Sequence, residues 1–127
     1  MILVTGGAGQ GKLSWALAHG GYPPEAASPR PEADAPVLTG LEALVGEALD
    51  RGEDPAALLP ALLAKEYVLC REVGCGVVPI HPAERRWREE VGRLCCRLAR
   101  EAAGVVRLWC GIPVWLKGGE GGCHTWS

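Results

Sequence analysis

The chain has 127 residues and a formal net charge of −2, and 48% of its residues are hydrophobic. This length is enough for one compact domain with a core. The slightly acidic balance gives no basic field for nucleic acid, and no apolar stretch is long enough to cross a membrane. We expect no nucleic-acid partner and no membrane contact. Because the first apolar run is too short for a secretion signal, we also expect a cytoplasmic protein.

Six cysteines are present, and no two of them form a C-x-x-C pair. In a chain without an export signal, such cysteines are expected to be reduced thiols. Cys123 and His124 are neighbours near the end of the chain, but no second pair with metal-ligand spacing accompanies them. The sequence therefore predicts no metal ligands among these residues.

A phosphate-binding loop, or P-loop, is predicted at residues 1–14, which read MILVTGGAGQGKLS. Residues 2–4 are typical of a buried strand, and residues 13–18 are typical of a helix. Between them, glycines let backbone N–H groups turn around an anion, the helix N-terminus adds partial positive charge, and Lys12 supplies a cation for the outer phosphates. The predicted nucleotide-binding residues are Gly6, Gly7, Ala8, Gly9, Gln10, Gly11, Lys12, Leu13 and Ser14.

One position departs from the P-loop pattern G-x-x-x-x-G-K-[ST]. Gly6, Gly11 and Lys12 match it, but Leu13 stands where the hydroxyl that holds Mg²⁺ is expected. Ser14 lies one residue later, about 100° further around the helix, so it cannot simply replace that hydroxyl. Two interpretations remain. The strand–loop–helix context favours a nucleotide-phosphate site with impaired metal binding over a glycine-rich turn that binds nothing.

The rest of the chain predicts a short series of strands and helices. In chain order these are an irregular surface connection at 20–36, a strand at 36–39, a helix at 41–49, a helix capped by Asp54 and kinked or broken at Pro60, a strand at 67–70, an amphipathic helix at 82–102 and a strand at 105–110. Residues 111–113 end the last strand, and no further strand is expected. We expect a single domain at residues 1–117 and a flexible tail at residues 118–127.

Glu72 is a second candidate catalytic residue beside Lys12. It follows the strand at 67–70, and ligands of parallel α/β sheets bind beyond the carboxyl ends of strands. Its carboxylate either faces a bound metal or substrate near the P-loop, or it pairs with Arg71 or caps a turn. The sequence favours neither interpretation.

The helix at 82–102 offers further cations. Its apolar residues recur at three- and four-residue spacing on one face, and charged residues cover the opposite face. Near its start, Arg85, Arg86 and Arg88 either form a solvated surface, which is the favoured interpretation, or supply one guanidinium to a phosphate.

Four segments together resemble one enzyme family. They are GGAGQGK after the first strand, EVGCGVVP after the strand at 67–70, RRWREEVGRLCCRLA in the long helix and VVRLWCGIPVWLK at the last strand. Their order and spacing are similar to those of the adenosylcobinamide kinase/adenosylcobinamide-phosphate guanylyltransferase family of cobalamin biosynthesis. The resemblance implies an α/β, RecA-like P-loop fold of three layers with a small, mostly parallel sheet. A typical domain of this kind has a second strand and helix where residues 20–36 lie, so one strand–helix unit has been lost.

The same resemblance implies ligands and an assembly. The family phosphorylates the side chain of adenosylcobinamide with a nucleoside triphosphate, ATP or GTP, and then transfers GMP from GTP through a histidine. Its members form homotrimers. The region that corresponds to the histidine motif is residues 20–36, which contain no histidine; His19 lies just before them.

Two further departures concern the metal. Leu13 replaces the P-loop hydroxyl, and Thr39 or Gly40 stands at the acidic position after the strand at 36–39. Glu42 is the nearest carboxylate, and we expect it on the following helix. Mg²⁺ would therefore lack its usual ligands. The sequence leaves three possibilities: a kinase without guanylyl transfer, a non-catalytic nucleotide-binding relative that serves as partner subunit of a full-length homologue, or a decayed domain that barely folds.

Overall fold

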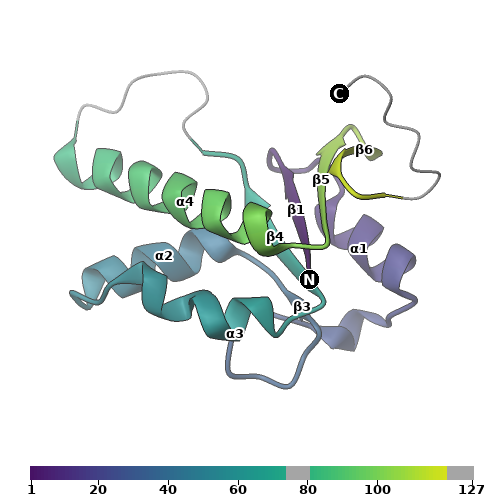
Figure 1. Cartoon of the computed structure of the whole chain (residues 1–127), viewed down its shortest axis with the longest axis horizontal. Helices are drawn as coiled ribbons and strands as arrows, with labels where there is room; N and C mark the ends of the chain where they lie inside the picture. The colour runs from purple at the N-terminus through teal and green to yellow at the C-terminus, as the bar shows by residue number, and fades with distance from the viewer. Residues whose placement is uncertain (74–80, 120–127) are drawn as a thin grey trace.

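A six-stranded sheet in the order β2-β3-β4-β1-β5-β6 forms the centre of the computed structural model, which describes residues 1–73 and 81–119 (Figure 1). The strands are β1 (Ile2–Gly6), β2 (Ala27–Ser28), β3 (Val37–Leu38), β4 (Tyr67–Arg71), β5 (Gly104–Trp109) and β6 (Ile112–Lys117). The α-helices are α1 (Lys12–Gly20), α2 (Leu41–Asp50), α3 (Leu59–Leu63) and α4 (Pro82–Glu101), and the 3₁₀ helices are η1 (Pro24–Ala26) and η2 (Pro55–Leu58). All neighbouring strands are parallel except β5 and β6. The predicted α/β class with a mostly parallel sheet is confirmed.

The sheet separates two apolar layers, one beneath α2, α3 and α4 and the other beneath α1. Figure 1 shows these helices on opposite faces of the sheet. Successive residues of a strand point to opposite faces, so the apolar runs of β1, β4 and β5 supply both layers. Leu3 and Val68 pack with α2, α3 and α4 on one face, whereas Val4 and Leu69 pack with Ala16 of α1 on the other. The predicted three-layer architecture is therefore confirmed.

The long helix α4 closes one face of the sheet. Its buried residues Val91, Leu94 and Leu98 recur at three- and four-residue spacing, as the sequence predicts. His81 begins the helix, since its Nδ1 accepts a hydrogen bond from the Ala83 N–H at 3.1 Å. None of the described helices is long and apolar enough to span a membrane.

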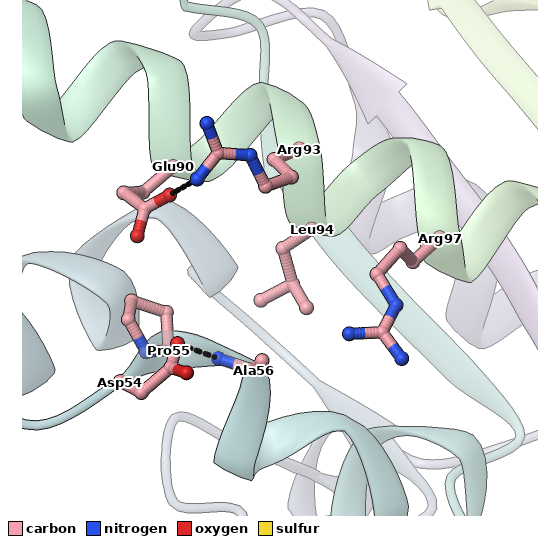
Figure 2. A pocket seen from close by; sticks show the side chains of 7 residues that line it. All are labelled: Asp54, Pro55, Ala56, Glu90, Arg93, Leu94 and Arg97. Atoms are coloured by element: carbon pink, nitrogen blue, oxygen red, sulfur yellow. Dashed lines mark hydrogen bonds and ion pairs between the residues drawn. The ribbon is translucent and has the colours of Figure 1, made fainter.

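The segment between α2 and β4 breaks where the prolines require it. Asp54 caps η2 by accepting from the Ala56 N–H at 3.0 Å, and Pro60 is the second residue of the separate helix α3. Figure 2 shows the resulting surface: Leu94 of α4 points toward η2, and the two elements border a cavity of about 240 Å³. The predicted cap and the predicted break are both confirmed.

The connection at 20–36 contains more regular structure than the sequence predicts. Residues 24–26 form η1, and Ala27 and Ser28 pair in parallel with Val37 and Leu38 as strand β2. The expected loss of a whole strand–helix unit is therefore wrong for the strand, which remains as two residues at the sheet edge, whereas no α-helix connects it to β3. Prolines before and after β2 limit its length.

A second correction concerns the end of the chain. Residues 112–117, where no strand is expected, form β6, which pairs antiparallel with β5. The turn between them has positive φ at Cys110 (50°) and Gly111 (77°), which is the conformation of a two-residue hairpin. Trp115 then packs its ring 5.6 Å from Trp15 of α1. Residues 120–127 of the predicted tail lie outside the described residues.

A hydrogen bond joins the start of the connection at 20–36 to the residue before β4, and this contact gives a prediction. The Tyr22 hydroxyl donates to the Glu66 carboxylate, and this hydrogen bond raises the pKa of Tyr22 to about 12. The stabilisation is fully present below the ordinary tyrosine pKa and is lost as the pH rises through about 12. We expect Tyr22 to stay neutral at about pH 11 and to ionise there in Glu66→Gln. Ultraviolet absorbance, taken as the difference from Tyr22→Phe, measures this, and equal ionisation of both proteins at that pH would contradict it.

Candidate functional site

The predicted P-loop lies between the carboxyl end of β1 and the amino end of α1. Gly9 (φ 73°) and Gly11 (φ 90°) adopt the left-handed conformation that glycine tolerates best. Gly11 is the N-cap of α1, and no side chain caps the helix there. The first N–H groups of an α-helix have no intrahelical acceptor, so the start of α1 presents donors and partial positive charge to an anion.

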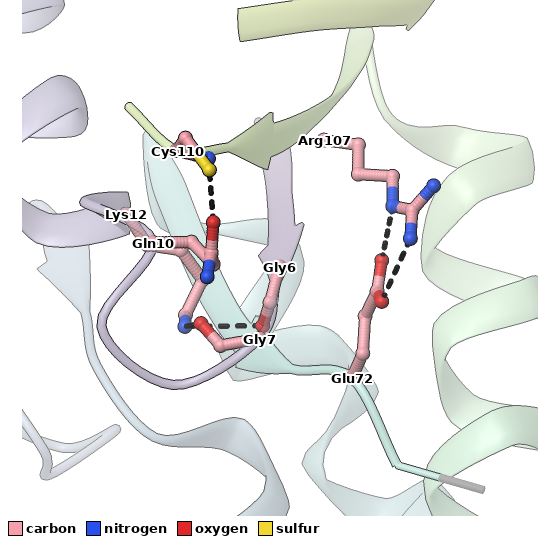
Figure 3. Close-up of polar contacts among 7 residues, drawn as sticks. All are labelled: Gly6, Gly7, Gln10, Lys12, Glu72, Arg107 and Cys110. Carbon is pink, nitrogen blue, oxygen red and sulfur yellow. Dashed lines mark hydrogen bonds and ion pairs between the residues drawn. The ribbon is translucent and has the colours of Figure 1, made fainter. Parts of the chain in front are cut away.

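Lys12 holds its ammonium against the start of this loop. Its Nζ lies 3.1 Å from the Gly6 carbonyl oxygen and 2.9 Å from that of Gly7, as Figure 3 shows. A lysine ammonium has three N–H donors, so two are used here and one is left for a ligand. These two hydrogen bonds fix the side chain at the loop.

Gln10 connects the loop to the turn between β5 and β6. Its backbone carbonyl accepts from the Gly111 N–H at 3.0 Å, and its side-chain Oε1 accepts from the Cys110 N–H (Figure 3). A Cβ atom on Gly11 would lie 3.5 Å from the Gly111 Cα. The hairpin that the sequence did not predict thus supports the P-loop from one side.

On its other side, the loop opens into a cavity of about 340 Å³. The cavity is lined by Gly9, Gly11, Lys12, Leu13, Ser14, Thr39, Gly40, Glu42, Leu69 and Arg71. Of the predicted nucleotide-binding residues, Gly6, Gly7, Ala8 and Gln10 belong to the loop but are not part of this lining. The P-loop thus shares a cavity with the end of β3, the first turn of α2 and the end of β4.

Glu42 is the carboxylate of this cavity among the described residues, and the sequence did not single it out as a site residue. It lies in the first turn of α2, as expected. Its Oε1 accepts from the Arg71 N–H at 2.9 Å, and its backbone carbonyl accepts from Trp87 Nε1 at 2.8 Å. These bonds fix Glu42 between β4 and α4. The sequence signal that could have identified Glu42 as a site residue was its position just after a short apolar strand.

Glu72 lies beside the P-loop but faces away from Lys12. Its backbone N–H donates to the Gly6 carbonyl at 3.0 Å, which places it next to the end of β1. Its carboxylate receives two hydrogen bonds from Arg107 of β5, at 2.6 and 3.2 Å (Figure 3). The Arg107 guanidinium also lies 5.5 Å from the centre of the Trp109 ring. Glu72 is thus paired, with Arg107 instead of Arg71.

The arginines at the start of α4 lie elsewhere. Arg88 pairs with Glu84 at 3.1 Å along the helix, and Arg85 and Arg86 are exposed. None of the three lines the cavity at Lys12, whereas Arg71 is among its lining residues. The described part of the chain therefore agrees with a solvated arginine face.

Comparison with known protein families assigns the chain to a family. The family model described as cobinamide kinase / cobinamide phosphate guanyltransferase matches residues 47–116, which are 70 of the 127 residues. This chain belongs to that family. The match begins after the P-loop and covers β4, α4 and β5. No curated protein matches the chain.

Membership of the cobinamide kinase / cobinamide phosphate guanyltransferase family connects the chain with cobalamin biosynthesis and with nucleotide and cobinamide ligands. The residues at 74–79, which belong to the EVGCGVVP segment, lie outside the described residues, as do Cys123 and His124. Within residues 1–73 and 81–119, no group of three or more His, Cys, Asp or Glu side chains forms a metal site by itself.

The two described histidines of this family member are both engaged in local packing. His19 stacks on Trp15 with 4.6 Å between ring centres, and its Nδ1 lies 2.7 Å from the Tyr67 hydroxyl. His81 caps α4. Neither of them lines the cavity at Lys12. A nucleophilic histidine is thus absent from that lining.

The ion pair between Glu72 and Arg107 gives a prediction for stability. The two side chains are 24% and 42% exposed, so water screens their interaction in part. We expect a double-mutant cycle of Glu72→Gln and Arg107→Gln, measured by urea unfolding, to give a coupling of about 1 kcal/mol. Glu89→Gln, an exposed control on α4, should change the free energy of unfolding by less than about 0.5 kcal/mol. A coupling of zero would show that the pair does not hold β5 to the end of β4.

Proposed function

We propose that this chain binds a nucleoside triphosphate through its P-loop and transfers a phosphoryl group to adenosylcobinamide, without a guanylyl transfer step. One observation supports this most: Lys12 and the amino end of α1 share a cavity with Glu42 and Arg71. A fixed cation and a helix N-terminus bind phosphate groups, and a carboxylate binds the metal ion that accompanies them in phosphoryl transfer. The family membership supports nucleotide and cobinamide ligands in general.

The positive groups of the cavity would hold the phosphates. Lys12 has one N–H donor left after its two bonds to the loop, and the first turn of α1 adds backbone donors. Arg71 of β4 lines the same cavity and would bring a further positive charge to it. Hydrogen bonds between such charged donors and phosphate oxygens are stronger than those between neutral groups.

Glu42 is the residue that would hold the Mg²⁺ of a bound nucleotide. Mg²⁺ prefers oxygen ligands and is commonly bound by one or two carboxylates together with phosphate oxygens. Glu42, Ser14 and Thr39 line this cavity, so one carboxylate and two hydroxyl groups would be available to the metal. The donor set therefore fits Mg²⁺, which, when bound, neutralises charge on the transferred group.

Guanylyl transfer through a histidine has no support in the described residues. His19 and His81 are used in packing and capping, and residues 20–36 contain none. The trimer implied by the resemblance stays a prediction, as do the domain limits and the cytoplasmic location.

A second candidate function is nucleotide binding without turnover. The observation that favours it is Leu13, which is 41% exposed and lines the cavity at the position of the usual metal-binding hydroxyl. Removing one electrostatic contact to a transition state costs about 3–4 kcal/mol, or a factor of about 10²–10³ in rate. A chain impaired to that degree would act as a nucleotide-responsive partner of a complete enzyme.

Lys12 tests the binding site itself. Lys12→Gln removes the ammonium but keeps most of the side-chain length. A hydrogen bond to a charged group contributes about 1.5–3 kcal/mol, so we expect affinity for GTP or ATP to fall about ten- to a hundredfold. Calorimetric titration without Mg²⁺ measures this. Arg85→Gln removes a positive charge from the exposed surface of α4 and is the matched control, with unchanged affinity. Equal affinity of Lys12→Gln and the unaltered chain would remove the basis of the proposal.

Glu42 separates the two candidate functions. The proposed kinase should convert adenosylcobinamide to its phosphate with ATP or GTP and Mg²⁺. Glu42→Gln keeps an oxygen for the Arg71 N–H but loses the charge, so we expect kcat to fall about 10²–10³-fold, with the Mg²⁺-free affinity unchanged. Glu89→Gln is the control. Nucleotide binding with no product above that of Lys12→Gln would reject the kinase and favour the second candidate.

A further inference from the structure

A pair of thiols lies between β4 and α4. The Cys70 Sγ and Cys95 Sγ atoms are 3.7 Å apart and share a hydrogen bond. Cys70 is 2% exposed, and Cys95 is partly exposed. The two residues belong to different elements and are separated by residues 71–94 of the chain, so a bond between their sulfurs would link the sheet directly to the helix that covers it.

A small cavity leads to this pair. Its volume is about 200 Å³, and besides the two cysteines it is lined by Thr5, Arg71, Glu72, Val73, Val91 and Gly92. A Cβ atom on Gly92 would meet no other atom within 4 Å, so this position of α4 leaves open space beside the thiols. A liquid water molecule takes up about 30 Å³, so the cavity has room for a reagent as small as hydrogen peroxide.

The two sulfurs differ in reactivity. The hydrogen bond with Cys95, followed by burial, raises the pKa of Cys70 well above its usual value. The same hydrogen bond lowers the pKa of Cys95. Since the thiolate is the nucleophile, Cys95 is the sulfur that attacks first, and Cys70 follows.

We propose that Cys70 and Cys95 form a peroxide-reactive dithiol that closes to a reversible disulfide. The Cys95 thiolate attacks one oxygen of hydrogen peroxide, the O–O bond breaks, and hydroxide leaves and takes up a proton, which gives sulfenic acid and water. Cys70 then loses its proton and attacks the Cys95 sulfur, the S–O bond breaks, and a second water is formed. Two thiols are thus oxidised by two electrons, and one peroxide is reduced to two waters.

The geometry makes this pair differ from the other described cysteines. A disulfide bond is about 2.05 Å long, so the two sulfurs must move closer together from 3.7 Å. Strand β4 and helix α4 do not have to come apart for this bond to form. Cys96 is exposed on the next position of α4, about 100° away around the helix, and Cys110 is exposed in the hairpin turn. Their exposure would favour oxidation of Cys96 and Cys110, but neither has a sulfur partner among the described residues. The short distance between their sulfurs favours disulfide formation between Cys70 and Cys95.

Peptide mapping tests the proposal on the full chain. Trypsin releases Cys70 in residues 66–71 and Cys95 in residues 94–97, and Cys96→Ser leaves Cys95 as the one cysteine of the second peptide. After hydrogen peroxide and alkylation without reductant, we expect these two peptides to be joined and to separate with dithiothreitol. The joined peptide should disappear in the added variant Cys95→Ser and persist in Cys110→Ser.

Thermal unfolding provides the second measurement. Because the bond closes residues 70–95 into a loop and restricts the unfolded chain, the oxidised Cys96→Ser protein should unfold at a higher temperature than its reduced form. The two peptides recovered separately after peroxide, or either cysteine joined to another one, would overturn the proposal. An oxidised protein that carries the joined peptide and melts no higher than the reduced one would overturn the inferred link between sheet and helix.

Discussion

The position of β1 between two parallel neighbours is the constraint on which the rest of the structure depends. Its backbone pairs with β4 on one side and with β5 on the other, so the carboxyl ends of all three strands lie at one edge of the sheet. The chain leaves that edge at Gly6 and returns as α1 at Lys12, so the loop and the N-terminus of α1 lie together at that edge. Everything proposed for the site follows from this arrangement.

The two neighbours of β1 support the loop in different ways. On the β5 side, Gln10 accepts hydrogen bonds from the hairpin turn, and Arg107 pairs with Glu72. On the β4 side, Glu42 holds the Arg71 N–H and lines the cavity with Lys12. The two carboxylates therefore have distinct tasks. Glu72 pairs with Arg107 of β5, and Glu42 lines the cavity in which we propose that a ligand binds.

Much of this architecture can be predicted from the sequence because its signals are local. The apolar run of β1, the glycines and Lys12 define the loop, and the spacing of Val91, Leu94 and Leu98 defines α4. Strand β2 escapes prediction because Ala27 and Ser28 lie in a proline-rich segment and, unlike Val37 and Leu38 of β3, are not residues that favour strands. Strand β6 escapes because Gly111 and Pro113 favour an end of structure, although a glycine suits a hairpin turn and a proline is tolerated on an edge strand.

The composition of the site depends on contacts that no local pattern contains. The pairing of Glu72 with Arg107 joins two strands separated by the whole of α4, and the place of Glu42 on the cavity depends on the packing of α2 against β4. The sequence could rank Glu72 and Glu42 as carboxylates after strands, but their side-chain partners decide which of them faces the loop. The same holds for Cys70 and Cys95, which come from a strand and a helix.

The proposed binding of phosphate by the P-loop is tested most directly by the backbone amides themselves. Titration of the ¹⁵N-labelled chain with GTP, followed by two-dimensional NMR, reports on each N–H group. We expect the largest chemical-shift changes at the amides of Gly9, Gly11, Lys12 and Leu13, with smaller ones at Arg71. Shift changes that leave these amides untouched, or that gather on another face of the protein, would contradict it.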